Sequence, residues 1–180
     1  MKILTALTFL CFFIFSLSAQ KMSKTSATAI GFKIKNAGIT VDGKFKTVKA
    51  AGTFDPTTTA NIKLTGTAYV KSVFTDNSLR DKHLRNKKDF FNMAKTPTVT
   101  MKSYKVEKLS EGKYKVYWKL TMRGVSKNIS TTMLAKKVSG GYKLSSRFKI
   151  DRNDWKLGGG GLKTIAMGDD VTVSLSTTFK

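Results

Sequence analysis

The sequence predicts an all-β protein of about eight strands, built as a sandwich or a barrel. Apolar and polar residues alternate with a period of two along most of the chain, which is typical of strands with one buried and one solvated face. Turn-forming residues separate these segments, and closure into a barrel would remove the exposed edges of the sheet. The 180 residues suffice for one domain, and their 41% apolar content allows a sizeable core.

The strands of the first half of the chain are expected at three places. One covers residues 30–34, and a turn at 36–38 leads to a second over 39–45. A longer strand is expected over 62–70, with one face formed by Ile62, Leu64, Gly66, Ala68 and Val70. Because Gly66 and Ala68 are small, this face leaves room for a bend or for a ligand.

The second half predicts two hairpins and a final strand. The first hairpin joins residues 99–103 to 114–122 through a turn at 110–112. The second joins 129–138 to 142–150, and the last strand covers 171–179. With these segments the sequence predicts about eight strands, which is enough for an antiparallel sheet to close into a barrel.

Residues 76–93 break the alternation and predict a short helical insert. Asp76 or Asn77 is available as the N-cap, and the apolar residues fit short helical turns: Leu79, His83 or Leu84, and Phe90 with Phe91. On a barrel, such an insert would act as a lid or end plug. The alternative is a simple crossover that covers one end of the core.

Residues 1–19 are interpreted as a secretory signal. Lys2 precedes an apolar run over 3–17 that is shorter than the roughly 20 residues of a membrane span, and small residues follow it. We expect cleavage after Ala19, with Ser18 as the alternative, so that residues 20–180 form a single mature domain. Cys11 is the only cysteine and is lost with the signal, so no disulfide is expected.

The chain is strongly basic, with 33 Lys and Arg against 11 Asp and Glu and a formal charge of +22. Such a charge attracts polyanions, and for an exported protein we expect an anionic membrane surface or acidic glycans instead of nucleic acid. The simpler interpretation is a solvated exterior. Lys113, Lys115 and Lys119 support it, because they alternate with apolar residues and form no single block.

Four motifs follow one another along the chain. The early motif combines residues 43–45 with 54–56, the middle one covers 120–127 and the late one 148–155. The longest runs over 77–84, 89–92, Pro97 and 101–103. Together, and in their order along the chain, these motifs resemble those of the YceI-like family of exported lipid-binding proteins. The resemblance extends over about residues 28–178.

The resemblance implies an antiparallel, eight-stranded, lipocalin-like barrel with the helical insert near residues 76–93. Its interior would hold an isoprenoid chain, such as a polyprenyl phosphate or a quinone-like molecule, without catalysis, and the protein would reside in a bacterial periplasm. Two departures from the family pattern concern the interior. Trp118 stands where the family usually has glycine, so it can shorten the tunnel, and Gly158 to Gly161 replace a shorter turn.

A long apolar ligand requires a dry lining with a few polar groups at the mouth. An eight-stranded barrel can also be filled by its own side chains, so each apolar candidate is either a lining residue or a core residue. The candidates for the lining are Phe32, Ile34, Val41, Phe45, Phe54, Ile62, Leu64, Phe74, Leu84, Phe90, Phe91, Met101, Leu120, Phe148, Ile150 and Trp155.

Cationic side chains could meet a phosphate or a quinone carbonyl at the mouth, and arginine offers a planar fork suited to phosphate. The candidates are Arg80, His83, Arg85 and Arg152. The structural alternative is that Arg80 pairs with Asp81 or another acidic residue, and Arg152 with Asp151 or Asp154. For the single histidine, the alternative is a hydrogen bond within the insert.

No catalytic or metal site is predicted. The chain has no Gly-x-Ser-x-Gly elbow, and one histidine without a mature cysteine leaves no recognised zinc spacing. The sequence therefore predicts a binding protein, monomeric or homodimeric, with no cofactor other than a bound isoprenoid lipid or quinone. The alternative is a filled barrel whose basic exterior binds anionic lipid head groups or acidic glycans.

Overall fold

The computed structural model describes residues 22–159 and 166–180, so the predicted signal at 1–19 lies outside the described residues. Most of the described chain belongs to one antiparallel sheet. Its strands are β1 (Thr25–Asn36), β2 (Ile39–Phe45), β3 (Val48–Thr53), β4 (Lys63–Tyr69), β5 (Val73–Phe74), β6 (Thr98–Ser110), β7 (Lys113–Met122), β8 (Val125–Val138), β9 (Gly141–Asp151) and β10 (Met167–Phe179).

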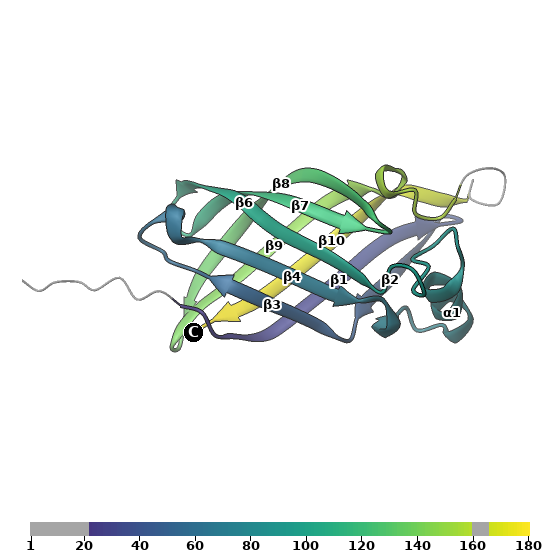
Figure 1. Cartoon of the computed structure of the whole chain (residues 1–180), viewed down its shortest axis with the longest axis horizontal. Helices are drawn as coiled ribbons and strands as arrows, with labels where there is room; N and C mark the ends of the chain where they lie inside the picture. Colours follow the sequence, from purple (N-terminus) through teal and green to yellow (C-terminus); the bar gives the residue numbers. More distant parts are fainter. Residues whose placement is uncertain (1–21, 160–165) are drawn as a thin grey trace, which may run out of the picture.

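The sheet has the strand order β3-β4-β6-β7-β8-β9-β10-β1-β2-β5 and curls into an elongated barrel (Figure 1). The barrel closes at a seam between β1 and β3 through a few bonds. Thr25 Oγ1 donates to the carbonyl of Ala50 at 2.8 Å, and the backbones of Met22 and Phe54 pair as an isolated bridge. The predicted lipocalin-like barrel is therefore confirmed.

The structure has ten strands where eight were expected. The unpredicted strand β3 has the sequence VKAAGT, in which small residues replace the large apolar side chains that mark a buried face. The other, β5, is only two residues long. Neither strand carries enough alternation to be distinguished from a loop.

The helical insert is confirmed, and its helix α1 (Ser78–Asn86) is shorter than the predicted segment. Asn77 is the N-cap, and its side chain accepts a hydrogen bond from the backbone N–H of Arg80 at 2.8 Å. Phe90 and Phe91 lie in the turns that follow. Short 3-10 helices occur at η1 (Thr59–Asn61), η2 (Val70–Ser72) and η3 (Arg152–Trp155). No helix among the described residues is long and apolar enough to cross a membrane.

One half of the barrel is filled by its own side chains, and we call it the filled half. Phe54 is fully buried and packs against three aromatic rings with centroid distances of 5.4–6.5 Å: Tyr114, Tyr142 and Phe179. Trp118 extends this core toward the middle of the barrel, where its indole N–H donates to Thr131 Oγ1 at 2.9 Å. The filled half includes the β6–β7 and β8–β9 turns, and α1 lies at the other end (Figure 1).

Candidate functional site

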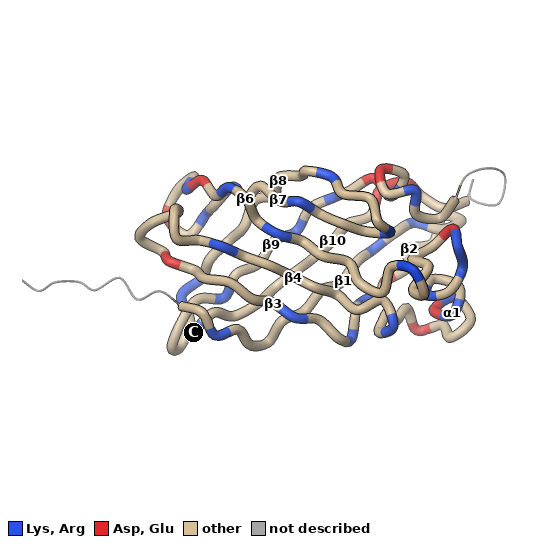
Figure 2. Tube along the Cα trace, viewed as in Figure 1, with Lys and Arg blue, Asp and Glu red and all other residues tan. Residues whose placement is uncertain are grey.

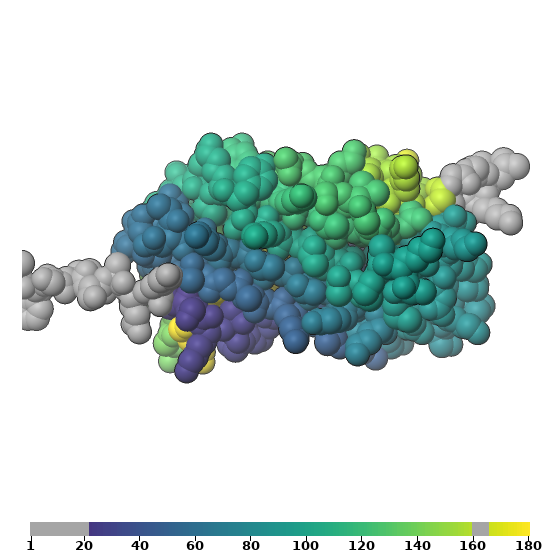
Figure 3. Space-filling model, viewed as in Figure 1, coloured from purple at the N-terminus to yellow at the C-terminus, as the bar shows by residue number. Residues whose placement is uncertain are grey.

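A cavity of about 520 Å³ occupies the other half of the barrel. Its walls come from β1, β2, β4, β6, β7, β9 and β10, and the insert covers that end of the barrel (Figure 3). Leu79 on α1 lines the cavity and is 62% exposed, so the cavity reaches the surface beside the helix. We call this opening the mouth.

The small residues of β4 account for part of the space. Gly66 and Ala68 both line the cavity, and an added Cβ on Gly66 would meet no atom within 4 Å. On the same face of β4, the larger Ile62 and Leu64 belong to the core of the filled half. The change from large to small side chains along one strand thus marks the change from filled to hollow.

Most of the predicted apolar candidates lie in the cavity wall. These are Phe32, Ile34, Val41, Phe45, Leu84, Phe90, Phe91, Met101, Leu120, Phe148 and Ile150. They come from strands in both halves of the sequence and from the insert, so the fold assembles one apolar surface from segments far apart in the sequence. Their contact with a ligand stays a prediction.

Five apolar candidates lie elsewhere. Phe54, Ile62 and Leu64 are buried in the filled half. The ring of Phe74 lies beneath the Lys46 ammonium, 3.6 Å from its centroid. Trp155 is buried behind the wall, where its indole N–H donates to the Leu120 carbonyl at 3.3 Å. Alternation alone could not separate these positions, because it defines the inner face of a strand but not the position along the barrel.

Sequence reasoning missed several lining residues: Ile30, Leu79, Val99, Met122, Leu157, Met167, Val171, Val173 and Leu175. The alternation along the last strand already placed Val171, Val173 and Leu175 on one face, so that signal was present in the sequence. No periodic pattern marks Leu157 and Met167, which approach the cavity only through the fold of the chain around η3.

Arg80 lines the mouth and is held by Thr75. Its Nε donates to Thr75 Oγ1 at 2.7 Å and its Nη2 to the Thr75 carbonyl at 2.5 Å. Asp81 binds the same threonine from the other side, accepting its hydroxyl at 2.6 Å and its backbone N–H at 2.9 Å. Arg80 and Asp81 therefore both fix the start of the insert, and no ion pair joins them to each other among the described residues.

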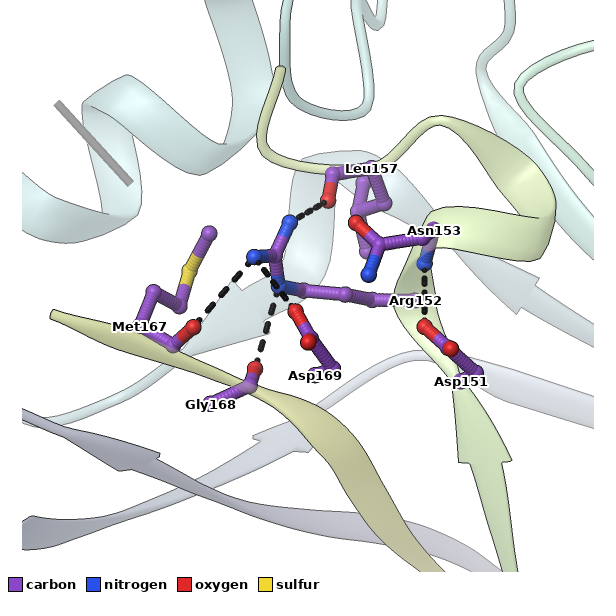
Figure 4. A network of polar contacts seen from close by, with 7 residues as sticks. All are labelled: Asp151, Arg152, Asn153, Leu157, Met167, Gly168 and Asp169. Carbon is purple, nitrogen blue, oxygen red and sulfur yellow. Dashed lines mark hydrogen bonds and ion pairs between the residues drawn. The ribbon is translucent and has the colours of Figure 1, made fainter. Parts of the chain in front are cut away.

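Arg152 also lines the cavity, but it is only 4% exposed and its guanidinium is extensively bonded (Figure 4). It donates at 2.9–3.3 Å to three backbone carbonyls and one carboxylate: Leu157, Met167, Gly168 and Asp169. The expected pairing with Asp151 or Asp154 does not occur. Asp151 instead accepts the backbone N–H of Asn153 at 2.8 Å. Arg152 thus joins η3 to the start of β10 at the rim of the cavity.

The two remaining polar candidates differ. His83 lines the cavity, and its imidazole forms no hydrogen bond within residues 22–159 and 166–180, so the expected bond within the insert is not observed. Arg85 lies outside the cavity and reaches the carbonyl of Val73 at 3.4 Å. The described part of the chain holds no group of three potential metal ligands. The site can therefore enclose an apolar chain and present a few polar groups at its opening.

Comparison with known proteins agrees with this architecture. The model of the YceI-like domain matches residues 22–179. The chain belongs to the YceI-like family. Among curated relatives, it is 40% identical over 101 residues to UPF0312 protein plu2095 of Photorhabdus laumondii, and 38% identical over 102 residues to UPF0312 protein YE1254 of Yersinia enterocolitica. Each match covers 56% of this chain and 52% of the relative, so the chain spans about half the length of the curated relatives it matches.

Solved structures share the YceI-like fold. A Campylobacter jejuni YceI protein is 34% identical with a TM-score of 0.69, and the match covers 78% of this chain and 85% of that protein. Burkholderia cenocepacia BcnA has a TM-score of 0.79 at 22% identity, with coverage of 84% and 95%. A polyisoprenoid-binding domain of Saccharophagus degradans, implicated in plant cell wall breakdown, has a TM-score of 0.66 at 16% identity, with coverage of 91% and 99%. The last two show likeness of fold alone.

The polar residues of the YceI-like motifs stabilise the frame of the cavity. Asn77 caps α1, and Arg152 closes the rim at η3. Arg123 donates to the carbonyls of Lys88 and Trp155, which ties the β7–β8 turn to the insert and to η3. In this chain, these hydrogen bonds position the open end of the barrel.

Proposed function

We propose that this YceI-like protein binds an isoprenoid or similar long-chain amphiphile in the cavity and performs no catalysis. The observation that carries the proposal is a cavity of about 520 Å³ with a mainly apolar wall and a few polar side chains, among them Arg80 at its mouth. An apolar chain buried there gains the free energy of leaving water, and its polar end remains near the solvent. The polyisoprenoid-binding description of the Saccharophagus degradans domain supports the same ligand class.

The depth of the cavity limits the length of chain that it can enclose. The wall extends along β1 from Ile30 to Asn36, about 20 Å along the strand and about 15 Å along the axis of a tilted barrel. With carbon–carbon bonds of about 1.5 Å, this depth accepts about twelve main-chain carbons, or about three isoprene units, in extended form. A longer tail would fold back or leave through the mouth.

Arg80 is the proposed contact for an anionic head group. Thr75 occupies its Nε and Nη2, and Nη1 forms no hydrogen bond with the residues that the structure describes. A phosphate at the mouth would gain a charge-assisted hydrogen bond from this nitrogen. Arg80→Gln should weaken binding of farnesyl phosphate about tenfold and leave that of farnesol nearly unchanged. Equal loss for both ligands would remove Arg80 from the head-group site.

We also propose that the protein is exported to a bacterial periplasm after removal of residues 1–19. The basis is the apolar run over 3–17 with small residues after it. N-terminal sequencing of the protein from its host tests this directly. A chain that begins near Gln20 supports export, and a chain that retains Met1 in the cytoplasm contradicts it.

The binding proposal is tested by native mass spectrometry and organic extraction of the protein purified from its own host. A stoichiometric isoprenoid is the expected result. The matched comparison uses Gly66→Leu, which should fill the cavity, and Thr67→Leu on the next position of β4, which does not line it. A bound lipid that survives equally in both variants would contradict the cavity as its site.

A further inference from the structure

The acidic residues are distributed unevenly between the two ends of the barrel. Of the eleven in the chain, only Asp55, Glu107 and Glu111 lie in the filled half (Figure 2). The carboxylate of Asp55 is buried and bonded to its own loop. Glu107 pairs with Lys105 at 2.6 Å and also accepts the hydroxyl of Tyr117. The lysines of the filled half therefore face almost no free carboxylate.

Five exposed residues form a patch on the outer face of this half, at the ends of the two hairpins. We call it the hairpin patch: Leu109, Lys113, Leu134, Lys136 and Lys143. The register places Lys113 opposite Leu134 on β7 and β8, and Lys136 directly opposite Lys143 on β8 and β9. Leu109 and Leu134 are 51% and 52% exposed.

Two features of this patch are unfavourable for the isolated protein. Like charges directly opposite each other on neighbouring strands destabilise a sheet, and none of these lysines forms an ion pair within the described residues. Glu111 in the β6–β7 turn offsets one of the charges at most. Two large leucine side chains beside the lysines also stay half in water, although the outer face of a strand can carry polar residues at no cost.

Both features are relieved by one kind of partner, a surface that is anionic outside and apolar just beneath. We propose that the hairpin patch docks the protein on a lipid bilayer that contains anionic lipids. Lysines near such a surface are attracted to the head groups, and leucines bury apolar area at the level of the upper acyl chains. An acidic glycan or a nucleic acid would match the lysines but leave Leu109 and Leu134 in water.

Docking in this way has a geometric consequence. The hairpin patch and α1 lie at opposite ends of the elongated barrel (Figure 1). The mouth of the cavity therefore lies at the end of the barrel away from the docked residues, and the ligand exchanges there with the aqueous side or with a second partner. This surface is independent of the cavity, so its test is also independent of the proposed ligand.

The experiment measures co-sedimentation of the protein with vesicles of equal parts phosphatidylglycerol and phosphatidylcholine. Each lysine near an anionic surface contributes about a fivefold factor in affinity, so the triple change Lys113→Gln, Lys136→Gln and Lys143→Gln should weaken binding about 100-fold. The matched control removes three exposed lysines of the cavity half, by Lys35→Gln, Lys82→Gln and Lys95→Gln, and should have little effect. An equal loss in both variants would show that only the net charge matters and would overturn the proposal.

A second variant separates a bilayer from other polyanions. Leu109→Ser with Leu134→Ser retains every charge and should weaken vesicle binding about tenfold, while binding to heparin stays unchanged. Because both leucines are half exposed, the fold should tolerate these changes, which circular dichroism can verify. Vesicle binding that is unaffected by loss of the leucines would identify the patch as a polyanion site and contradict bilayer docking.

Discussion

Trp118 is expected to form the floor of the cavity. On the inner face of β7 it lies two residues from Leu120, which lines the cavity, and it is itself only 4% exposed and outside the wall. Replacement by a small residue should open one more layer of the barrel. Two residues of strand correspond to about 7 Å along β7 and about 5 Å along the barrel axis, so the depth should grow from about 15 Å to about 20 Å.

The added depth accepts about four more main-chain carbons, or about one isoprene unit. Trp118→Leu is the first variant to make, because Trp118→Ala would cost about 3–5 kcal/mol in this core, whereas leucine keeps part of the lost volume. Both changes leave Thr131 Oγ1 without its donor. The assay compares the affinities for farnesol and geranylgeraniol, which differ by one isoprene unit. We expect the preference to shift toward the longer alcohol.

The control is Trp118→Phe, which removes the indole N–H but retains a ring in the floor. It should lose about 1–2 kcal/mol of stability and keep the preference of the unmodified protein. If Trp118→Leu folds and its chain-length preference is unchanged, Trp118 is not the floor, and the depth is set elsewhere.

Three further predictions concern other parts of the frame. Gly66→Leu should fill the cavity and abolish uptake of a fluorescent fatty acid, with the melting temperature retained, and Thr67→Leu should leave uptake intact. Hydrogen bonds from Thr57 and its neighbours lower the pKa of Asp55 from 3.8 to about 2. The ionised carboxylate therefore stabilises the fold above about pH 4, and the free energy of unfolding should fall by up to about 2 kcal/mol as the pH drops through 2. Urea unfolding of Asp55→Asn should not show this decline. Arg152→Leu should cost about 3 kcal/mol in urea unfolding, because Asp169 and the rim carbonyls lose their donor, and a cost below about 1 kcal/mol would contradict the role of Arg152 as a clamp.

The sequence predicted the fold well because alternation is strong in the long strands. Along β7, Tyr114, Val116, Trp118, Leu120 and Met122 are all buried, as a period of two requires. The same signal fails for β3, whose register with β4 is set by backbone bonds rather than by large side chains. Strand prediction from alternation is therefore reliable only where the inner face has volume to bury.

The site was predicted less completely than the fold, for two physical reasons. Alternation tells which residues point inward but not where along the barrel they lie, so Phe54 and Phe45 looked equivalent although only Phe45 reaches the cavity. The partner of Arg152 was also beyond sequence reasoning. Nearby Asp151 and Asp154 looked suitable, but the fold brings Asp169 to the guanidinium across the sheet.

The residues that hold the frame and the residues that set the volume play different parts in the proposed ligand site. The hydrogen-bonding residues of the motifs, such as Asn77 and Arg152, position the insert and the rim. The width and depth depend instead on Gly66 and Trp118, which lie outside the motifs. A single change at either position can alter the enclosed volume while every bond of the frame is kept. Chain-length preference in this protein should therefore follow the side chain at position 118 more closely than its similarity to any relative.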